Sequence, residues 1–324
     1  MTPVTNPLAL SLNALRNLPP DPLLALLFPG QGSQKVGMGR EAYDAVPEAR
    51  AIFDHADSLL GFNLSKLCFE GPADELTQTM NAQPAILVTS LAYLVANLHS
   101  GAISRRPAFL AGHSLGEYSA LVAAGALAFR DALALVRERG RLMDGAGRER
   151  PGTMAAIVGL TGDKVRQICD ASGAEPCNFN ARTQTVIGGA PEAVRAACDL
   201  ARERGGKGLS MNVAGAFHTS LMEPASLQFA RVLEDVPFKD PTIQVIGNVT
   251  ATTMNDADQC ISDLGQQMAR PVLWHDSIEH MRQAGVRTFI ELGPGRALTA
   301  MIKRDAPELE LVSLDGVAAT ASAS

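Results

Sequence analysis

The residues with the clearest chemical potential form one short turn, Gly112-His113-Ser114-Leu115-Gly116. This G-x-S-x-G pattern follows the apolar segment PAFLA and precedes the helix-forming segment EYSALVAAGALAF, which is the context of a nucleophile elbow. Side chains at positions 112 and 116 would clash where the tight turn brings backbone segments together. Ser114 is then held on a strained turn with its hydroxyl exposed, and the amide of Leu115 is a natural oxyanion-hole donor. The alternative is a glycine-rich turn that contains an incidental serine.

A serine nucleophile needs a proton acceptor, and His218 is the strongest candidate. His55 and His99 lie in helical, partly polar segments, and strand alternation predicts that His113 points away from the site. His218 lies at the junction of two predicted domains, where clefts for small molecules tend to form. The order of serine before histidine also occurs in hydrolase-type folds. The alternative is a hydrogen-bonded structural histidine, and no acid that would complete a triad is visible.

An arginine falls on an apolar stripe in the segment that follows the elbow. At helical spacing, Arg139 continues the stripe formed by Ala132, Leu135, Val136, Leu142 and Met143. Arg139 is therefore expected to point inward, and a buried guanidinium requires an anionic partner. The residues alone leave two partners open, an internal Asp or Glu and a carboxylate on a ligand.

A second glycine-containing loop, FPGQGSQ at residues 28–34, follows the first predicted strand. It does not fit a nucleotide-binding loop: Lys35 stands where G-x-G-x-x-G needs glycine, and Met38 follows Gly37 where a P-loop needs lysine. Ligands of α/β sheets bind beyond the carboxyl ends of the strands, so this loop and the elbow are expected to face each other. The amide of Gln31 is then a second candidate oxyanion donor, although a purely structural turn is equally compatible with the letters.

The elements that must position these residues alternate between strands and helices. Short apolar runs at residues 23–28, 107–111, 243–249, 288–292 and 309–314 predict a mostly parallel sheet covered on both faces. Residues 152–213 instead predict the order β-α-β-β-α-β, a ferredoxin-like arrangement. We therefore expect a discontinuous catalytic domain, residues 23–151 and 214–316, interrupted by that small subdomain. Residues 1–22 are predicted to be a dispensable extension, and residues 317–324 a frayed tail.

Composition excludes several other classes of protein. The 324 residues carry a net charge of −6, which argues against bulk nucleic-acid binding. Five cysteines without a C-x-x-C pair indicate reduced thiols, and neither cysteines nor histidines show the spacing of a metal site. No apolar run approaches the length of a membrane span, and the start of the chain lacks the pattern of a secretory signal. We expect a cytoplasmic protein without a metal.

Taken together, the motifs resemble those of the malonyl-CoA:acyl-carrier-protein transacylases, the acyltransferases of fatty-acid and polyketide synthesis. The resemblance extends over residues 24–316. It rests on eight segments of the sequence: FPGQGSQ at 28–34, AQPAI at 82–86, GHSLGEYSALVAAG at 112–125, RG-x-LM at 139–143, NFN at 178–180, GAFH-x-x-LM at 215–222, PV-x-W at 271–274 and ELGPG at 291–295.

The resemblance implies a fold and a reaction. The fold would be an α/β-hydrolase-like core interrupted by a ferredoxin-like subdomain. Ser114 would be the acylated nucleophile, His218 its base, and Gln31 and Leu115 the oxyanion donors. Arg139 would pair with the free carboxylate of a malonyl group, which reverses the preference for an internal ion pair that the residues alone suggest.

Three further residues gain roles through the resemblance. The backbone carbonyl of Gln267 would orient the histidine, which would explain why no acid is visible, and Asn180 would be a polar residue near the pocket. Phe217 is similar to the residue found in malonyl-selective members.

The implied reaction is ping-pong transfer of malonyl from malonyl-CoA to the phosphopantetheine thiol of acyl carrier protein, by a monomer without a cofactor. An acidic carrier protein would dock on basic residues in or beside the small subdomain, namely Arg148, Arg150, Arg182, Arg202, Arg204 and Lys207. Three alternatives remain: a thioester hydrolase on the same scaffold, an acyltransferase of different acyl specificity, and a non-catalytic subunit of a synthase.

Overall fold

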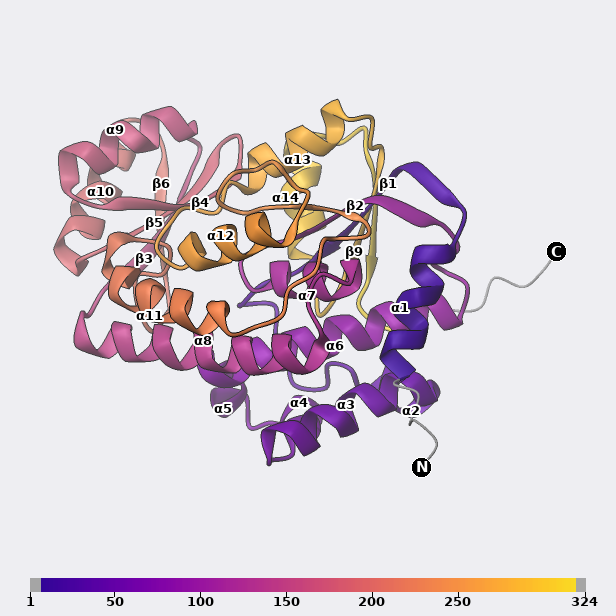
Figure 1. Ribbon diagram of the computed structural model, residues 1–324. Helices are drawn as coiled ribbons and strands as arrows, with labels where there is room; N and C mark the ends of the chain where they lie inside the picture. The colour runs from indigo at the N-terminus through magenta and orange to yellow at the C-terminus, as the bar shows by residue number, and fades with distance from the viewer. Residues whose placement is uncertain (1–6, 319–324) are drawn as a thin grey trace.

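The larger of the two sheets contains the five strands predicted from the sequence, and these five strands run parallel to one another. The computed structural model describes residues 7–318 (Figure 1). The order across this sheet is β10-β9-β1-β2-β7-β8, and only the β7–β8 pair is antiparallel. The two-residue β8 was not predicted, because so short a strand leaves no readable hydrophobic pattern. The strands are β1 (Pro20–Phe28), β2 (Arg106–Gly112), β7 (Gln244–Ile246), β8 (Thr253–Met254), β9 (Thr288–Leu292) and β10 (Glu310–Leu314).

The central strands are buried on both faces, as a parallel sheet requires. Along β1, Leu26 and Phe28 pack into one apolar core, while the alternate residues Ala25 and Leu27 pack into the other. Helices α13 and α14 contribute to the second core, and most of the remaining helices contribute to the first. The helices around this sheet are α2 (Arg40–Ala45), α3 (Pro47–Leu60), α4 (Leu64–Glu70), α5 (Ala73–Thr77), α6 (Thr79–His99), α7 (Gly116–Ala124), α8 (Phe129–Glu149), α11 (Glu223–Glu234), α12 (Ala257–Gln267), α13 (Trp274–Gln283) and α14 (Ala297–Asp305).

Register brings the ends of three strands to one edge of the sheet. Phe28 at the end of β1 pairs with Gly112 at the end of β2, and Ala111 pairs with Ile246 at the end of β7. The loops that leave these strands therefore meet at the same edge, which is where α/β sheets place their ligands.

The smaller sheet has its own core and its own element order. Its four strands pair only antiparallel in the order β4-β5-β3-β6, and helices α9 and α10 pack on it. The sequence of elements is β-α-β-β-α-β, as predicted for residues 152–213. Figure 1 shows this unit at one end of the larger sheet. Its elements are β3 (Thr153–Val158), α9 (Gly162–Ser172), β4 (Glu175–Ala181), β5 (Gln184–Gly189), α10 (Pro191–Glu203) and β6 (Lys207–Met211).

A backbone bridge joins the two units next to the predicted site. Val272 donates its amide to the carbonyl of Cys177 at 2.8 Å, and its own carbonyl accepts from the amide of Phe179 at 2.9 Å. This short parallel pairing links β4 to the segment that follows α12. The one-turn helix η1 (Ser220–Met222) follows the return of the chain into the larger unit.

Residues 7–17 of the N-terminal extension pack against the core, which the prediction of a dispensable segment did not anticipate. Residues 7–17 form helix α1 (Pro7–Asn17), in which Leu8, Leu12 and Leu15 are buried against the larger unit. These leucines recur at the spacing of one helical face, and the apolar area they bury explains the difference. The predicted tail falls mostly outside the described residues, but the amide of Ala318 donates to Asn97 Oδ1 at 3.0 Å.

Removing core volume from α1 should destabilise the whole protein. Leu15 is 0% exposed and Leu10, on the opposite face, is 56% exposed. We expect Leu15→Ala to lower the free energy of unfolding by about 2–5 kcal/mol, measured by urea denaturation. Leu10→Ala is the matched control and should change it by no more than about 0.5 kcal/mol. Equal effects of the two substitutions would mean that α1 does not belong to the cooperative core.

Candidate active site

The turn between β2 and α7 has the strained geometry of a nucleophile elbow. Ser114 has a φ of +52°, which is uncommon for a residue with a side chain. A Cβ atom at Gly112 would overlap the main chain of Gly116, and one at Gly116 would overlap the main chain of Phe28. Only glycine fits at both positions, which confirms the predicted clash and explains why the serine can turn its hydroxyl out of the sheet.

The side chain of Asn248 fastens this turn to the neighbouring strand. Its Oδ1 accepts from the amide of Ser114 at 2.6 Å, and its Nδ2 donates to the carbonyl of Gly112 at 2.7 Å. Asn248 is 1% exposed and is the second residue after the end of β7. The sequence analysis missed it. The available signal was a polar residue just beyond a buried strand at the carboxyl edge of the sheet.

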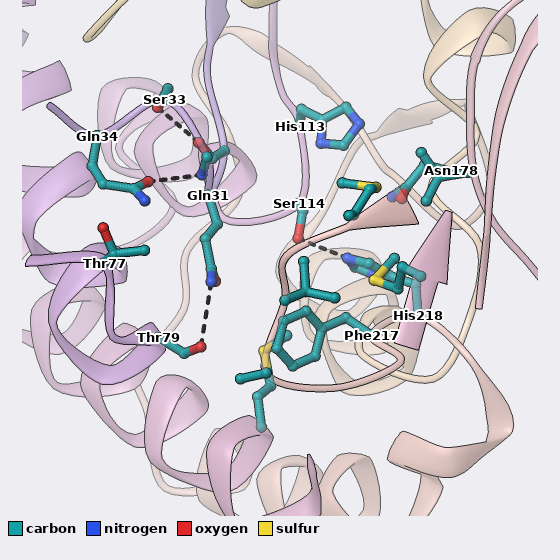
Figure 2. A pocket seen from close by; sticks show the side chains of 18 of the residues that line it. Gln31, Ser33, Gln34, Thr77, Thr79, His113, Ser114, Asn178, Phe217 and His218 are labelled. Carbon is teal, nitrogen blue, oxygen red and sulfur yellow. Dashed lines mark hydrogen bonds between the residues drawn. The ribbon is translucent and has the colours of Figure 1, made fainter. Parts of the chain in front are cut away.

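His218 lies where a base for Ser114 should be. Its Nε2 is 2.8 Å from Ser114 Oγ (Figure 2). Its Nδ1 is 2.7 Å from the main-chain carbonyl of Gln267. Because a carbonyl can only accept, Nδ1 carries the proton and Nε2 is left free to accept one from the serine. The φ of His218 is +62°, and its amide donates to the carbonyl of Met268 at 2.9 Å. The main chain thus orients the imidazole through Gln267 and holds the backbone of His218 through Met268.

The environment of His218 keeps the imidazole neutral. Burial, together with the nearby Arg139 cation, lowers the pKa of His218 from 6.5 to about 3. A base that remains unprotonated down to acidic pH is available over the whole physiological range.

Arg139 points into the site from α8, as the apolar stripe predicts. It is 1% exposed, and its Nη2 donates to Ser114 Oγ at 3.0 Å and to Gln267 Oε1 at 2.8 Å. Its Nη1 donates to Gln83 Oε1 at 2.9 Å. No ion pair to an Asp or Glu within 4.0 Å is found for this guanidinium among residues 7–318. The internal ion pair considered from the sequence is therefore not formed, and a buried cation adjoins the nucleophile.

Gln83 is a second residue without a role in the sequence analysis. It is 0% exposed on α6 and accepts from Arg139 with one end of its amide, while its Nε2 contacts the sulfur of Met143. The segment AQPAI drew attention to this position, but nothing local indicated that α6 and α8 pack side by side there.

The loop at residues 28–34 faces the elbow as predicted. A Cβ atom at Gly30 would overlap the main-chain oxygen of His113, so the two loops are in close contact. Gln31 is exposed and lines the cavity, and its side chain donates to Thr79 Oγ1 at 3.3 Å. Leu115 is fully buried and occupies the N-cap position of α7. Both positions border Ser114, so their amides remain the candidate oxyanion donors.

A cavity of about 770 Å³ opens over Ser114 between the two units. Asn180, 7% exposed, lines it from the smaller unit, and Phe217, 6% exposed, lines it from the segment where the chain has returned to the larger unit. Asn180 Oδ1 is 2.8 Å from His113 Nε2. His113 itself lines the cavity, contrary to the prediction that it points away. Strand alternation does not extend to it, because β2 ends at Gly112 and the chain turns sharply there.

Two other features of the described chain bear on its class. No helix among residues 7–318 is long and apolar enough to span a membrane. Within the same residues, no three His, Cys, Asp or Glu side chains gather in a group that could hold a metal ion.

Comparison with known proteins agrees with this geometry. The model of the acyl transferase domain family matches residues 25–320. The chain belongs to this family. Among curated members, a malonyl CoA-acyl carrier protein transacylase of Bacillus subtilis is 44% identical over 90% of this chain and 93% of its own length. One from Escherichia coli O157:H7 is 40% identical over 92% of this chain and 98% of its own. The resemblance seen in the motifs is thereby confirmed.

Solved structures of family members share the fold. An acyl carrier protein S-malonyltransferase from Vibrio cholerae superposes with a TM-score of 0.87 at 38% identity, covering 91% of this chain and 97% of that one. A malonyl-transacylase in complex with its type II PKS acyl-carrier protein superposes with a TM-score of 0.86 at 36% identity, covering 90% and 96%. The α/β architecture, a mostly parallel sheet with a second antiparallel one, is that of the family.

The low pKa of His218 should make the reactivity of Ser114 insensitive to mild acid. For a histidine with a pKa of 6.5, the fraction of neutral imidazole would fall about tenfold between pH 7.5 and pH 5.5. For His218 this fraction should hardly change. We expect the rate of inactivation by phenylmethanesulfonyl fluoride to change by less than about twofold over this range. Ser114→Ala is the control for site-specific labelling, and a tenfold fall in the wild-type rate would contradict the prediction.

Proposed function

We propose that this chain transfers the malonyl group from malonyl-CoA to the phosphopantetheine thiol of acyl carrier protein, through a malonyl ester of Ser114. The observation that carries the proposal is the buried guanidinium of Arg139, which has no carboxylate partner among the described residues 7–318 and lies 3.0 Å from Ser114 Oγ. An acyl group with a free carboxylate supplies the missing anion when it is attached to that oxygen. The names of the relatives at about 40% identity support the same substrate pair.

Acylation begins when malonyl-CoA places its carboxylate against Arg139, a charge-assisted contact that Arg can make in bidentate form. Ser114 Oγ attacks the thioester carbonyl while His218 Nε2 takes the hydroxyl proton. The amides of Gln31 and Leu115 stabilise the oxyanion of the tetrahedral intermediate, and the loss of one such donor is typically worth about 3 kcal/mol. The intermediate collapses to the malonyl ester, and the CoA sulfur leaves with the proton held by His218.

The second half of the reaction repeats these steps with another thiol. His218 takes the proton of the phosphopantetheine thiol, and the sulfur attacks the ester carbonyl of the malonylated serine. Collapse of this intermediate returns the proton to Ser114 Oγ and releases malonyl-carrier protein. In this scheme the chain uses no cofactor or metal of its own, because CoA and phosphopantetheine enter with the substrates.

Selectivity within this scheme comes from two sides of the cavity. Arg139 favours acyl groups that end in a carboxylate, since the buried cation is otherwise uncompensated. Phe217 lines the cavity next to the base, and in this scheme its large ring disfavours a branch on the acyl chain. Asn180 keeps the imidazole of His113 against the same wall through its 2.8 Å contact.

The carrier protein approaches at the mouth of the cavity, beside the smaller unit. Of the basic residues named for this contact, Arg148 lines the cavity and pairs with Asp144 at 2.6 Å, while Arg202 pairs with Asp199 at 2.8 Å. Because these exposed arginines are paired with aspartates, they attract the acidic carrier protein only weakly. Electrostatic steering of the carrier protein is therefore limited to the mouth of the cavity.

The finer description of the fold is part of the same proposal. The larger unit is an α/β-hydrolase-like core formed by residues 23–151 and 214–316, and the smaller unit, residues 152–213, is a ferredoxin-like subdomain. The chain acts as a monomer in the cytoplasm, which accords with cysteines 68, 169, 177, 198 and 260 being free.

The first test concerns the nucleophile. Wild-type protein mixed with malonyl-CoA should gain one malonyl group, because Ser114 forms a stable ester until a thiol arrives. Ser114→Ala should gain none, as read by mass spectrometry of the intact protein. Acylation of Ser114→Ala would place the nucleophile elsewhere, and rapid release of free malonate from the wild type would indicate a hydrolase.

The second test concerns acyl selectivity. Arg139→Ala should lower the rate of malonyl ester formation by about 100-fold while changing acetyl ester formation by no more than about threefold, because only malonyl supplies a carboxylate. Arg141→Ala is the matched control, since Arg141 lies on the same helix but is exposed and pairs only with Glu138. Equal losses with malonyl-CoA and acetyl-CoA would remove Arg139 from substrate recognition.

A further inference from the structure

One buried residue contacts all three groups of the proposed reaction. Gln267 is 0% exposed, and its Oε1 accepts from Arg139 Nη2 at 2.8 Å. Its Nε2 donates to the main-chain carbonyl of Ser114 at 3.1 Å, and its own main-chain carbonyl is 2.7 Å from His218 Nδ1. The side-chain amide of Gln267 therefore bears on the nucleophile and the cation, and its main-chain carbonyl bears on the base.

The amide of Gln267 functions in one orientation only. Reversed end for end, it would point its NH₂ group at the guanidinium of Arg139, and two donors would then face each other. Its present orientation is fixed by an acceptor at the far end. Glu117 Oε2 accepts from Gln267 Nε2 at 2.6 Å, and Glu117, on α7, is 0% exposed.

Glu117 is in turn joined to a second buried carboxyl group. Asp263 on α12 is 3% exposed and lies within hydrogen-bonding reach of Glu117, for whose Oε1 the described residues supply no other partner. The oxygens of Asp263 accept from the amide of Val249 at 3.2 and 3.3 Å. Two carboxylates cannot approach this closely unless one holds a proton. Main-chain donors lie at Asp263, so the negative charge belongs there and the proton belongs on Glu117.

The surroundings of Glu117 agree with this division. Burial and the neighbouring Asp263 carboxylate raise the pKa of Glu117 well above its usual value. The other ionisable groups that face it are Arg139 on α8, Cys260 on α12 and Tyr118 on its own helix. A protonated Glu117 donates to Asp263 with one oxygen and accepts from Gln267 with the other, and it leaves the charge of Arg139 uncancelled.

We propose that Glu117, hydrogen-bonded to Asp263, is a positioning residue that acts as a neutral acid: it fixes the amide of Gln267 and thereby holds Arg139 for the carboxylate of the acyl group. The inference rests on the proposed malonyl transfer. It assigns selectivity for carboxylated acyl groups to a chain of three side chains, Glu117, Gln267 and Arg139, of which only the last touches the substrate.

Two substitutions at position 117 separate a neutral hydrogen-bonding role from a role of charge or of packing. Glutamine has the shape and the donor and acceptor ends of a protonated glutamate, whereas methionine has similar length and no acceptor of comparable strength. We expect Glu117→Met to lower the ratio of malonyl to acetyl ester formation by about 10- to 100-fold. Glu117→Gln should recover most of that ratio, measured by mass spectrometry with both thioesters.

The effect must also pass through Arg139. In an Arg139→Ala background, Glu117→Met should cause no further loss of the malonyl-to-acetyl ratio, because the group on which it acts is gone. Gln267→Met breaks the same chain at the next link and keeps the main-chain carbonyl, so it should lower the ratio as Glu117→Met does. A Glu117→Met loss that is undiminished in the Arg139→Ala background would overturn the inference.

Stability against pH gives a readout that does not depend on activity. Because the folded protein holds the Glu117 proton more tightly than the unfolded chain, it binds more protons above about pH 4.5, and its stability falls as the pH rises. Glu117→Gln cannot ionise, so its melting temperature should gain on the wild type from pH 5 to pH 8. No gain would show that Glu117 is ionised in the folded protein, and this outcome overturns the inference even if the methionine variants do not fold. A loss of acyl selectivity in Glu117→Gln as large as in Glu117→Met would show that an ionised carboxylate is required.

Failure of the proposed function is recognised separately. If the wild type forms no malonyl ester from malonyl-CoA, the proposed function and this inference both fall. If the wild type is malonylated selectively and Glu117→Met folds and remains as selective, only the role of Glu117 falls.

Discussion

A positive charge without an anion, fully enclosed by protein, is the constraint on which the rest of the site depends. Burial lowers the pKa of Arg139, yet the guanidinium remains charged because its ordinary pKa is so high. Leaving such a cation in a medium of low polarity is costly, and two glutamine oxygens and a serine hydroxyl compensate it only in part. The protein therefore holds a buried cation without a neutralising anion beside its nucleophile. A substrate with a carboxylate neutralises this cation, whereas a substrate without one gains no binding energy from it.

The same cation helps to set the state of the base. Its positive charge disfavours a second positive charge on His218, so the group that we propose selects the acyl chain also keeps the imidazole ready to accept a proton. The imidazole is oriented by a main-chain carbonyl rather than by a carboxylate. A carboxylate in that place would have attracted the guanidinium and supplied it with a permanent partner. The use of the Gln267 carbonyl is thus consistent with leaving Arg139 free for the substrate.

The sequence was sufficient to predict a residue's role wherever all the evidence for that role lies within one contiguous segment. The elbow could be predicted because its strand, glycines and helix are contiguous, and the inward direction of Arg139 because a helical stripe lies within one segment. Roles that depend on the packing of distant segments could not be predicted. Gln83 and Asn248 reach the site from α6 and from the end of β7, and no local pattern indicates which helix or strand will lie next to them. The direction of His113 was wrong because a strand rule was applied past the end of the strand.

The bridge between Val272 and β4 has a consequence for how the cavity works. The smaller unit is connected to the larger one by two crossings of the chain, near residues 150 and 214, and the Val272 pairing adds a third attachment. A fourth joins Arg182 of the smaller unit to α14, where Asp305 Oδ2 accepts from the amide of Arg182. A body held at two points can swing about the line that joins them, whereas a body held at three points that do not share a line cannot. The smaller unit therefore acts as a fixed wall, and the two thioester substrates must use an opening whose width is set when the chain folds. Exchange of one large substrate for the other is then governed by how each fits a constant aperture, without a closing movement to be completed between the two halves of the reaction.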